Sequence, residues 1–317
     1  MQISKYILTF IFIASFELSA QTYIAPYVFG DSLLQVLISD YRTSTTLGYN
    51  NARDTMYAII DNNEGFVYGV YSDFSVGLVP SSDPSITMYN GGINCEHVWP
   101  QSMGADSEPM RSDMHHLFPC KENINSTRSN NPYGEIEDNL ADNWFYQDIV
   151  LQNIPSSSIN NYSESYTSSS NDLFEPKEDR KGDIARSIFY FKTIYEQSAN
   201  QSFFDSQKDI LFEWHYYDPI DNQELNRTWN IAHYQDGIPN PFVIDPTLIW
   251  RSYFSDIYML GDINLDQALD VLDIILIMNQ VLGLTNLSTL QYHQSDFNAD
   301  FVIDILDITI MINVILN

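Results

Sequence analysis

The sequence predicts an α+β fold: a mixed core of helices and strands, followed by a small all-α domain. Three observations support this prediction. Helical apolar spacing begins at Asp31, and a second helical stretch covers 52–60. A strand-like run rich in valine and aromatic residues follows at 65–71. The last residues, 261–317, contain one pattern twice, and each copy ends in helical apolar spacing.

The first twenty residues predict an export signal. Lys5 is their only cation, an apolar run covers 7–16, and the small residue Ala20 ends the segment. The run is too short to span a bilayer, and no later segment approaches about 18 consecutive apolar residues. We therefore expect a secreted protein without membrane insertion. Its expected parts are a signal peptide (1–20), a large domain (21–255), a linker (256–260) and a small domain (261–317).

Further elements are expected along the large domain. Residues 81–94, rich in Ser, Asp, Asn and Gly, predict a loop or hairpin turn. A helix is expected to start at Asn123 and to be stopped early by a proline and a glycine. Residues 155–172 predict a Ser- and Asn-rich loop, 182–191 an amphipathic helix, and 211–251 a mixture of helix and Pro-rich loop.

The chain is strongly acidic, with a formal net charge of −28. Residues 261–317 hold eight aspartates and no Lys or Arg, which leaves −20 for residues 1–260. Proteins that bind nucleic acids usually gain affinity from Lys and Arg that displace counterions from phosphates. The charge therefore argues against tight nucleic-acid binding, although it does not exclude an enzyme that acts on nucleic acid.

Two cysteines, Cys95 and Cys120, are the only ones in the chain. In an exported protein an even number of cysteines favours a disulfide. A bridge closing a loop of this size would contribute roughly 3 kcal/mol through chain entropy. The alternative is two buried free thiols.

The repeated pattern in the tail predicts two calcium loops. Oxygen-bearing side chains occupy loop positions 1, 3, 5, 9 and 12 in both copies, which lie 34 residues apart. The first copy consists of Asp262, Asn264, Asp266, Asp270 and Asp273, and the second of Asp296, Asn298, Asp300, Asp304 and Asp307. Carboxylates about 5 Å apart repel one another by roughly 1 kcal/mol in water and by more at lower dielectric, so each loop needs a divalent cation to close. We expect two Ca²⁺ ions rather than two solvated acidic loops.

The two repeats are expected to pack together. Each calcium loop precedes apolar residues at helical spacing, and neither helix can bury such a face alone. The matching residues are Ile274, Ile277, Met278, Val281 and Leu282 in the first copy and Ile308, Met311, Ile312, Ile315 and Leu316 in the second.

A set of chemically suitable residues lies between 96 and 128. Glu96 and Asn125 carry oxygen ligands, which suit a hard ion such as Mg²⁺, with Mn²⁺ or Ca²⁺ as alternatives. His97 has an unperturbed pKa near neutrality, so it can act as a general base. An ion with only two protein ligands keeps open positions for water and phosphate oxygens. The set therefore predicts metal-assisted hydrolysis of a phosphodiester.

These residues resemble the endonuclease I family of secreted, non-specific nucleases with a ββα-metal active site. Similar blocks occur at 174–176, 181–186, 213–219 and 235–242, so the resemblance spans roughly residues 31–251. It implies that Glu96 and Asn125 hold the metal and that His97 activates water. It also implies cleavage of DNA, and of RNA as well, that leaves 5′-phosphates.

The resemblance also points to supporting residues, each with a structural alternative. Arg128 lies one helical turn after Asn125, where it reaches the scissile phosphate or forms a surface ion pair; Arg111 is a weaker candidate for the phosphate. Asp113 and His115 orient the base or belong to a polar core network. Both alternatives remain open at the level of sequence.

The tail resembles a type I dockerin module over all of 261–317. Gln267 and Phe301 replace the glycine at loop position six of the EF-hand consensus, and position twelve is Asp rather than Glu. Dockerins bind cohesin-type partners, with specificity set mainly at loop positions ten and eleven, here Val271-Leu272 and Ile305-Leu306. These apolar pairs predict a partner surface or mutual burial.

Two other interpretations remain open. The tail could stabilise the protein through calcium without docking to a partner. The whole chain could be a catalytically silent binding protein, docked to a surface or scaffold, which its acidity favours.

Overall fold

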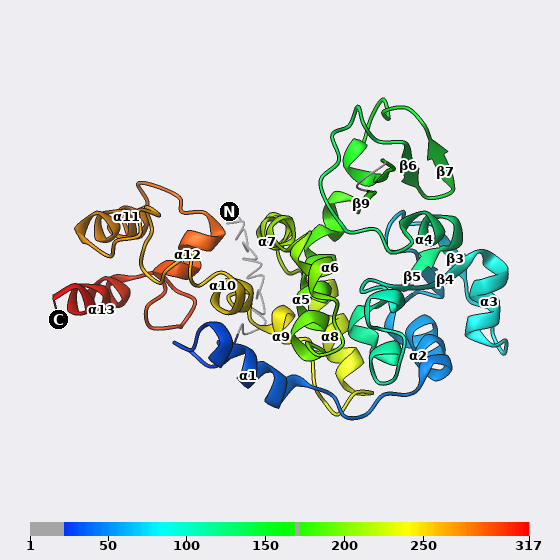
Figure 1. The fold of residues 1–317 in the computed structure, drawn as a ribbon, viewed down its shortest axis with the longest axis horizontal. Helices are drawn as coiled ribbons and strands as arrows, with labels where there is room; N and C mark the ends of the chain where they lie inside the picture. The colour runs from blue at the N-terminus through cyan, green and yellow to red at the C-terminus, as the bar shows by residue number, and fades with distance from the viewer. Residues whose placement is uncertain (1–21, 169–171, 317) are drawn as a thin grey trace, which may run out of the picture.

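The computed structural model describes residues 22–168 and 172–316. The expected signal peptide (1–20) and part of the expected loop at 155–172 lie outside the described residues. Helices form the centre of the molecule, three small sheets lie on one side, and the C-terminal helices lie on the other (Figure 1). The expected α+β organisation is therefore confirmed. Within the described ranges, no helix is long and apolar enough to cross a membrane.

The α-helices are α1 (Gly30–Tyr41), α2 (Tyr49–Thr55), α3 (Pro84–Gly91), α4 (Glu122–Arg128), α5 (Lys181–Ile194), α6 (Gln201–Asp205), α7 (Lys208–Tyr217), α8 (Asn222–Ala232), α9 (Pro241–Ile244), α10 (Leu248–Tyr253), α11 (Val271–Val281), α12 (Thr289–Ser295) and α13 (Ile305–Leu316). Shorter helical segments are the π-helical η1 (Met56–Ile60) and the 3₁₀ turns η2 (Gln101–Met103), η3 (Met110–Ser112), η4 (Met114–His116), η5 (Ile159–Asn161) and η6 (Glu178–Arg180). The strands are β1 (Asn62–Asn63), β2 (Phe66–Tyr68), β3 (Ser75–Gly77), β4 (Ile93–His97), β5 (Leu117–Lys121), β6 (Asn143–Tyr146), β7 (Ile149–Leu151), β8 (Ser163–Tyr166) and β9 (Leu173–Glu175).

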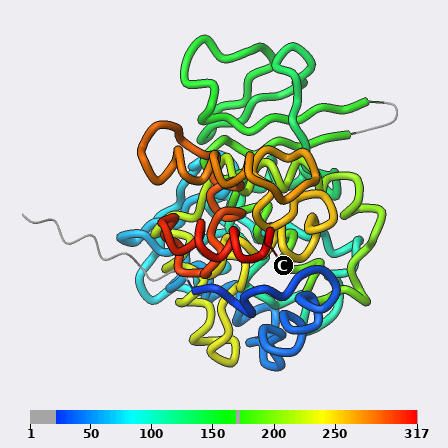
Figure 2. The backbone as a smooth tube through the Cα atoms, turned by 90° about the vertical axis from the view of Figure 1, so that its left-hand side faces the viewer, coloured from blue at the N-terminus to red at the C-terminus, as the bar shows by residue number. Residues whose placement is uncertain are grey.

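The strands form three antiparallel sheets. Their orders are β1-β2-β3, β4-β5 and β7-β6-β8-β9. The third sheet projects from the rest of the molecule in both views (Figures 1 and 2). Its strand β8 lies within the stretch expected to be a loop, so that part of the loop prediction is wrong. Pairing with β6 and β9 satisfies the backbone groups of this Ser-rich segment.

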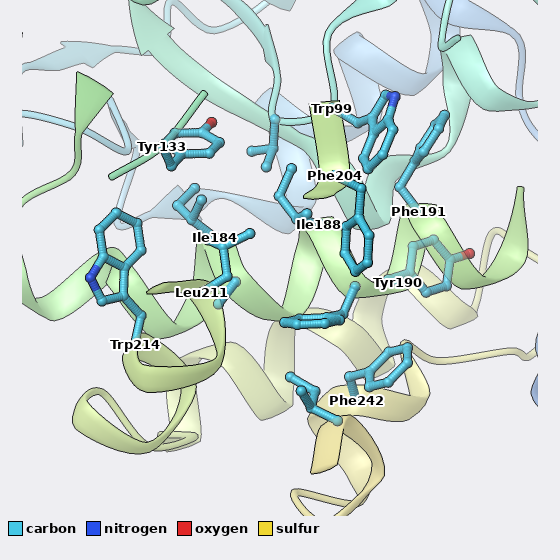
Figure 3. Close-up of a cluster of buried hydrophobic side chains, with 14 of the residues drawn as sticks. Trp99, Tyr133, Ile184, Ile188, Tyr190, Phe191, Phe204, Leu211, Trp214 and Phe242 are labelled. Atoms are coloured by element: carbon cyan, nitrogen blue, oxygen red, sulfur yellow. The ribbon is translucent and has the colours of Figure 1, made fainter. Parts of the chain in front are cut away.

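Helix α5 is the centre of the core. The helix expected at 182–191 is confirmed, but all residues of α5 are buried, so the expected solvent-facing side is wrong. Its side chains Ile184, Ile188, Tyr190 and Phe191 point into the cluster drawn in Figure 3. The indole of Trp99 stacks on the ring of Phe191, with the ring centroids 4.7 Å apart.

The buried Arg186 of α5 has partners on α8 and at the end of α7. Arg186 Nε donates to Glu224 Oε1 on α8 at 2.7 Å, and Arg186 Nη1 donates to the carbonyl of Asp218 at 2.9 Å. Gly182 permits this close packing, because a Cβ there would lie 1.9 Å from the Asp218 carbonyl oxygen. These hydrogen bonds and the ion pair compensate for the burial of the Arg186 charge, which explains how an arginine fits inside the core.

The segment at 81–94 contains helix α3, which replaces the expected loop. The side chain of Asp83 caps the helix by accepting a hydrogen bond from the backbone N–H of Ile86 at 2.8 Å. Pro84 occupies the first turn, and Gly92, with φ 88°, ends the helix in the left-handed region. The residues that suggested a loop are thus the caps of a short helix.

Strands β4 and β5 and helix α4 form a compact ββα unit. The two strands pair antiparallel, with Glu96 opposite Phe118 and His97 opposite Leu117. Helix α4 follows β5 without a gap and packs against both strands. The helix expected from Asn123 is therefore confirmed, and it lies where the sequence resemblance requires it.

The two tail repeats pack together as expected. Helices α11 and α13 lie side by side around a small hydrophobic cluster, and a third helix, α12, which the sequence did not reveal, lies between them in the chain. The buried members of that cluster are Ile263, Ile277, Phe297, Ile308 and Met311. The tail also touches the N-terminal segment: Tyr27 Oη donates to the carbonyl of Phe297 at 2.7 Å, and the C-terminal helix lies close to that segment in Figure 2.

Candidate functional site

Asn125 is fixed on α4 by the neighbouring strand. Its Nδ2 donates to Asn94 Oδ1 at 2.7 Å and to the carbonyl oxygen of Cys95 at 3.2 Å. Because a backbone carbonyl can only accept, these contacts identify the nitrogen of the amide. The amide oxygen of Asn125 therefore points away from β4 and remains available as a ligand.

Glu96 lies on the face of the hairpin that α4 covers. Its side chain is 2% exposed. Its Oε1 accepts a hydrogen bond from Tyr71 Oη at 2.9 Å and lies 3.4 Å from Arg128 Nη1. Burial raises the pKa of Glu96 to about 7, although Arg128 and the hydroxyls of Tyr71 and Tyr133 act in the opposite direction.

Arg128 is fully buried, so the alternative of a surface ion pair is wrong. Its Nη2 donates to the carbonyl of Val98 at 2.7 Å, and its Nη1 donates to that of His97 at 3.3 Å. Its guanidinium also lies 4.5 Å from the ring centroid of Tyr133. In this arrangement Arg128 holds the end of β4 and neutralises Glu96.

His97 has one nitrogen that can accept a proton. Its Nε2 lies 3.0 Å from the carbonyl oxygen of Arg111, which requires the hydrogen to be on Nε2. The lone pair is therefore on Nδ1, which Gln101 Nε2 approaches at 3.3 Å. Burial, followed by the nearby His116, lowers the pKa of His97 to about 3. The ring is neutral at physiological pH, which is the form a general base requires.

The structure brings only part of the predicted set together. Consecutive residues of a strand point to opposite faces. The contacts of Glu96 are Tyr71 and Arg128, whereas the ring of His97 faces Tyr49 and His116, each with centroids 5.5 Å away. Glu96, Asn125 and Arg128 therefore lie on the α4 side of the hairpin, and the His97 side chain lies on the other side. The sequence interpretation missed this alternation, which the adjacency of residues 96 and 97 already implied.

Asp113 belongs to a buried polar network. Its carboxylate accepts hydrogen bonds from Tyr190 and Tyr195 at 2.7 Å each and from Gln235 Nε2 at 2.8 Å. Burial alone would raise the pKa of Asp113, but His115, His116 and these hydrogen bonds hold it below its ordinary value. Such a fully satisfied carboxylate ties η4 to α5.

His115 lies beside Asp113 but does not contact the proposed base. Its Nε2 donates to the carbonyl of Ile238 at 3.0 Å, and its ring packs against Tyr190. The contacts of both residues favour the polar core network that the sequence left open.

The expected disulfide is wrong, because Cys95 and Cys120 are both free. The hairpin register explains why. Cys120 pairs with Asn94, and Cys95 pairs with Pro119, so the two cysteines point to opposite faces. Cys95 packs with the smaller hydrophobic cluster and Cys120 with the main one. Burial raises the pKa of both thiols.

The two tail loops have the same internal structure. The first aspartate of each loop accepts hydrogen bonds from the backbone N–H groups of the fifth and sixth residues, and the twelfth accepts from those of the second, third and ninth. Gln267 and Phe301 adopt φ values of 65° and 61°, so the left-handed conformation forms without glycine.

The carboxylates of these loops face their own backbone amides. Asp262, Asp273 and Asp307 are completely buried. Across the described residues, no three His, Cys, Asp or Glu side chains converge in a way that could already hold a metal. A bound cation would therefore have to draw the carboxylates of each loop together.

The comparisons with known proteins concern the large domain. Residues 31–247 match the model of the family described as Endonuclease I. The chain is 29% identical over 173 residues to an extracellular ribonuclease of Bacillus subtilis (strain 168), which covers 49% of this chain and 52% of that protein. It is 28% identical over 171 residues to an extracellular ribonuclease of Bacillus amyloliquefaciens, with the same coverage. The chain thus spans about half the length of the curated relatives it matches.

Proposed function

Because the chain belongs to the endonuclease I family, we propose that it is a secreted, metal-dependent endonuclease that cuts DNA, and RNA as a second substrate, with little sequence preference. The observation that carries the proposal is the ββα unit, which places the oxygens of Glu96 and Asn125 on one side of β4 and His97 at its end. The matched relatives support secretion and action on RNA through their names.

Glu96 and Asn125 are the residues that would hold the catalytic ion. The test of fit is the donor set: one carboxylate and one amide oxygen, the latter left free by the anchoring of its nitrogen. Hard oxygen donors suit Mg²⁺, and Mn²⁺ or Ca²⁺ as alternatives. When bound, such an ion supplies positive charge that stabilises the phosphate and the departing oxygen.

His97 would act on the attacking water. Its Nδ1 takes one proton from water as the oxygen bonds to phosphorus, the bond from phosphorus to the 3′ oxygen breaks, and the 3′ oxygen takes up a proton from solvent. The products are a 5′-phosphate and a 3′-hydroxyl. Gln101, which is exposed, must move away from Nδ1 for this to happen. Because Glu96 and His97 lie on opposite faces of the hairpin and both are buried, we propose that the substrate strand crosses the end of β4.

Chelation provides the direct test of this function. We expect the mature protein to nick supercoiled plasmid and to degrade RNA in the presence of Mg²⁺ or Mn²⁺, and we expect EDTA to abolish both reactions. Agarose electrophoresis with purified protein measures this. Equal cleavage with and without chelator, or no cleavage with any divalent ion, would contradict the proposal. Binding of an oligonucleotide without cleavage would instead support the catalytically silent alternative.

We also propose that the tail binds two Ca²⁺ ions and docks to a cohesin-type partner. No Lys or Arg occurs in 261–317 to neutralise its aspartates. The apolar pairs at loop positions ten and eleven are all more than half exposed, with Val271 at 60% and Ile305 at 62%. Mutual burial of these pairs is therefore wrong, and an exposed apolar surface supports a partner. Substitution of Leu272 and Leu306 by Asp should abolish binding to a cohesin.

Calcium binding by the tail can be measured in the full chain. We expect Asp273→Asn and Asp307→Asn each to remove one bound Ca²⁺, and the double variant to remove two, in isothermal titration calorimetry. Each site should stabilise the protein by about 2.7 kcal/mol at a Ca²⁺ concentration 100 times its dissociation constant. Asp148→Asn is the matched control, because that carboxylate is 75% exposed and lies outside the loops. Unchanged stoichiometry in the double variant would disprove the calcium sites.

A further inference from the structure

Two arginines near His97, Arg53 and Arg111, form no ion pair with an Asp or Glu side chain, unlike most of the Lys and Arg residues that the structure describes. Among the described residues, the ion pairs cover eight of the Lys and Arg side chains but neither Arg53 nor Arg111. This is unexpected in a chain with a net charge of −28. The Nε atoms of both arginines are buried and have no hydrogen-bond partner. Two buried donors thus lack an acceptor.

Both guanidinium groups lie over the same ring. The Cζ atom of Arg53 is 4.7 Å from the ring centroid of Tyr49, and that of Arg111 is 4.5 Å from it. The Tyr49 ring in turn lies 5.5 Å from the ring of His97. The backbone carbonyl of Arg111 is the group that accepts the hydrogen bond from His97 Nε2. The two arginines therefore belong to the side of the hairpin on which the proposed base lies.

This arrangement suits an anion with several oxygens. Two positive charges on one ring repel each other, and unpaired buried N–H donors cost free energy. A phosphodiester in contact with both guanidinium groups would supply acceptors and offset the repulsion. Guanidinium forks match phosphate geometry, and the Tyr49 ring restricts their orientation.

We propose that Arg53 and Arg111, held over Tyr49, form a phosphate-binding pair that grips the substrate backbone next to His97. The pair rests on the proposed nuclease function, for which it supplies a substrate contact. It also accounts for nucleic-acid binding by an acidic protein. The acidic protein does not attract the nucleic-acid backbone at long range, so its affinity for nucleic acid depends on a few local contacts.

The test compares two double variants that remove the same charge. In Arg53→Gln/Arg111→Gln, we expect the KM for an oligonucleotide to rise at least about tenfold, with a smaller change in kcat. The slope of log affinity against log salt, measured in EDTA to prevent cleavage, should become shallower by about 0.7–0.9 for each lost phosphate contact. Arg42→Gln/Lys208→Gln is the matched control, because neither residue has an ion pair and neither contacts Tyr49. We expect it to leave KM and slope nearly unchanged.

Further variants and outcomes separate this inference from the proposed function. Arg53→Lys/Arg111→Lys keeps the charge but loses the planar forks, so its affinity should still fall, and it replaces the glutamine variant if that one does not fold. The proposed phosphate-binding role of Arg53 and Arg111 would be overturned by an unchanged KM and salt slope in a variant that folds. An equal loss of affinity in the control variant would also overturn it. If the wild-type protein bound the oligonucleotide through these arginines but cut nothing, only the nuclease function would fail.

Discussion

Replacing His97 with alanine should lower the rate of plasmid nicking about 10²- to 10⁴-fold, because general-base catalysis contributes a factor of this size. The variant loses Nδ1, the one ring nitrogen of His97 that is left free to accept a proton. Binding of oligonucleotide in EDTA should change little, since the ring is 6% exposed and carries no charge. Added imidazole should restore part of the rate, because it can occupy the vacated space and accept the proton.

His233→Ala is the matched control for this prediction. His233 is an exposed histidine, and its loss should leave the nicking rate unchanged. The assignment of the base is wrong if His97→Ala nicks plasmid at the wild-type rate while remaining folded. A large loss of rate without imidazole rescue, together with a lower melting temperature, would indicate that His97 is structural.

The ββα unit was expected through the resemblance to the endonuclease I family, whereas local signals in the sequence indicated only its helix. Glu96, His97 and Asn125 lie within 30 residues, and the start and early end of α4 follow from short-range chemistry. The same kind of signal misled at α3, because Asp, Pro and Gly cap a short helix with the residues that also form turns. Composition alone does not separate these two uses.

Long-range burial could not be predicted in this way. Helix α5 carries polar residues that suggest a solvent face, yet Arg186 meets Glu224, 38 positions away in the chain. Similarly, Glu96 is covered by Tyr71, which precedes it by 25 residues. The failure of the disulfide prediction has a different cause: it depends on strand register, and a shift of one residue reverses the face of each cysteine.

Tertiary contacts also determined the place of Arg128. The sequence offered a contact to phosphate or an ion pair at the surface. The structure instead places its guanidinium between the carboxylate of Glu96 and two carbonyl groups at the end of β4. Arg128 thus fixes both the side chain of Glu96, the proposed metal ligand, and the backbone of His97, the proposed base. This positioning role can be tested separately.

Replacing Arg128 with methionine should destabilise the protein by about 3–5 kcal/mol, because it leaves Glu96 buried without its charge partner. The variant also deprives the carbonyls of His97 and Val98 of a donor. Urea denaturation measures the free energy of unfolding. Combining Arg128→Met with Glu96→Gln should recover part of the lost stability, since the unpaired charge is then absent. The double variant should remain inactive, because it lacks one of the two proposed metal ligands.

Measurements of stability and of substrate affinity together distinguish two roles of Arg128. As a clamp, it stays buried and holds Glu96 and the two backbone carbonyls; alternatively, it contacts the phosphate of the substrate. If Arg128 is a clamp, Arg128→Lys should keep the charge but lose part of the stability, because one ammonium cannot reach Glu96 and both carbonyls with the geometry of a guanidinium. Its salt dependence of oligonucleotide binding should match that of the wild type. Wild-type stability combined with a shallower salt slope would instead show that Arg128 leaves the core to bind phosphate. In that case the arrangement of Glu96 and Arg128 described above would be that of the substrate-free protein only.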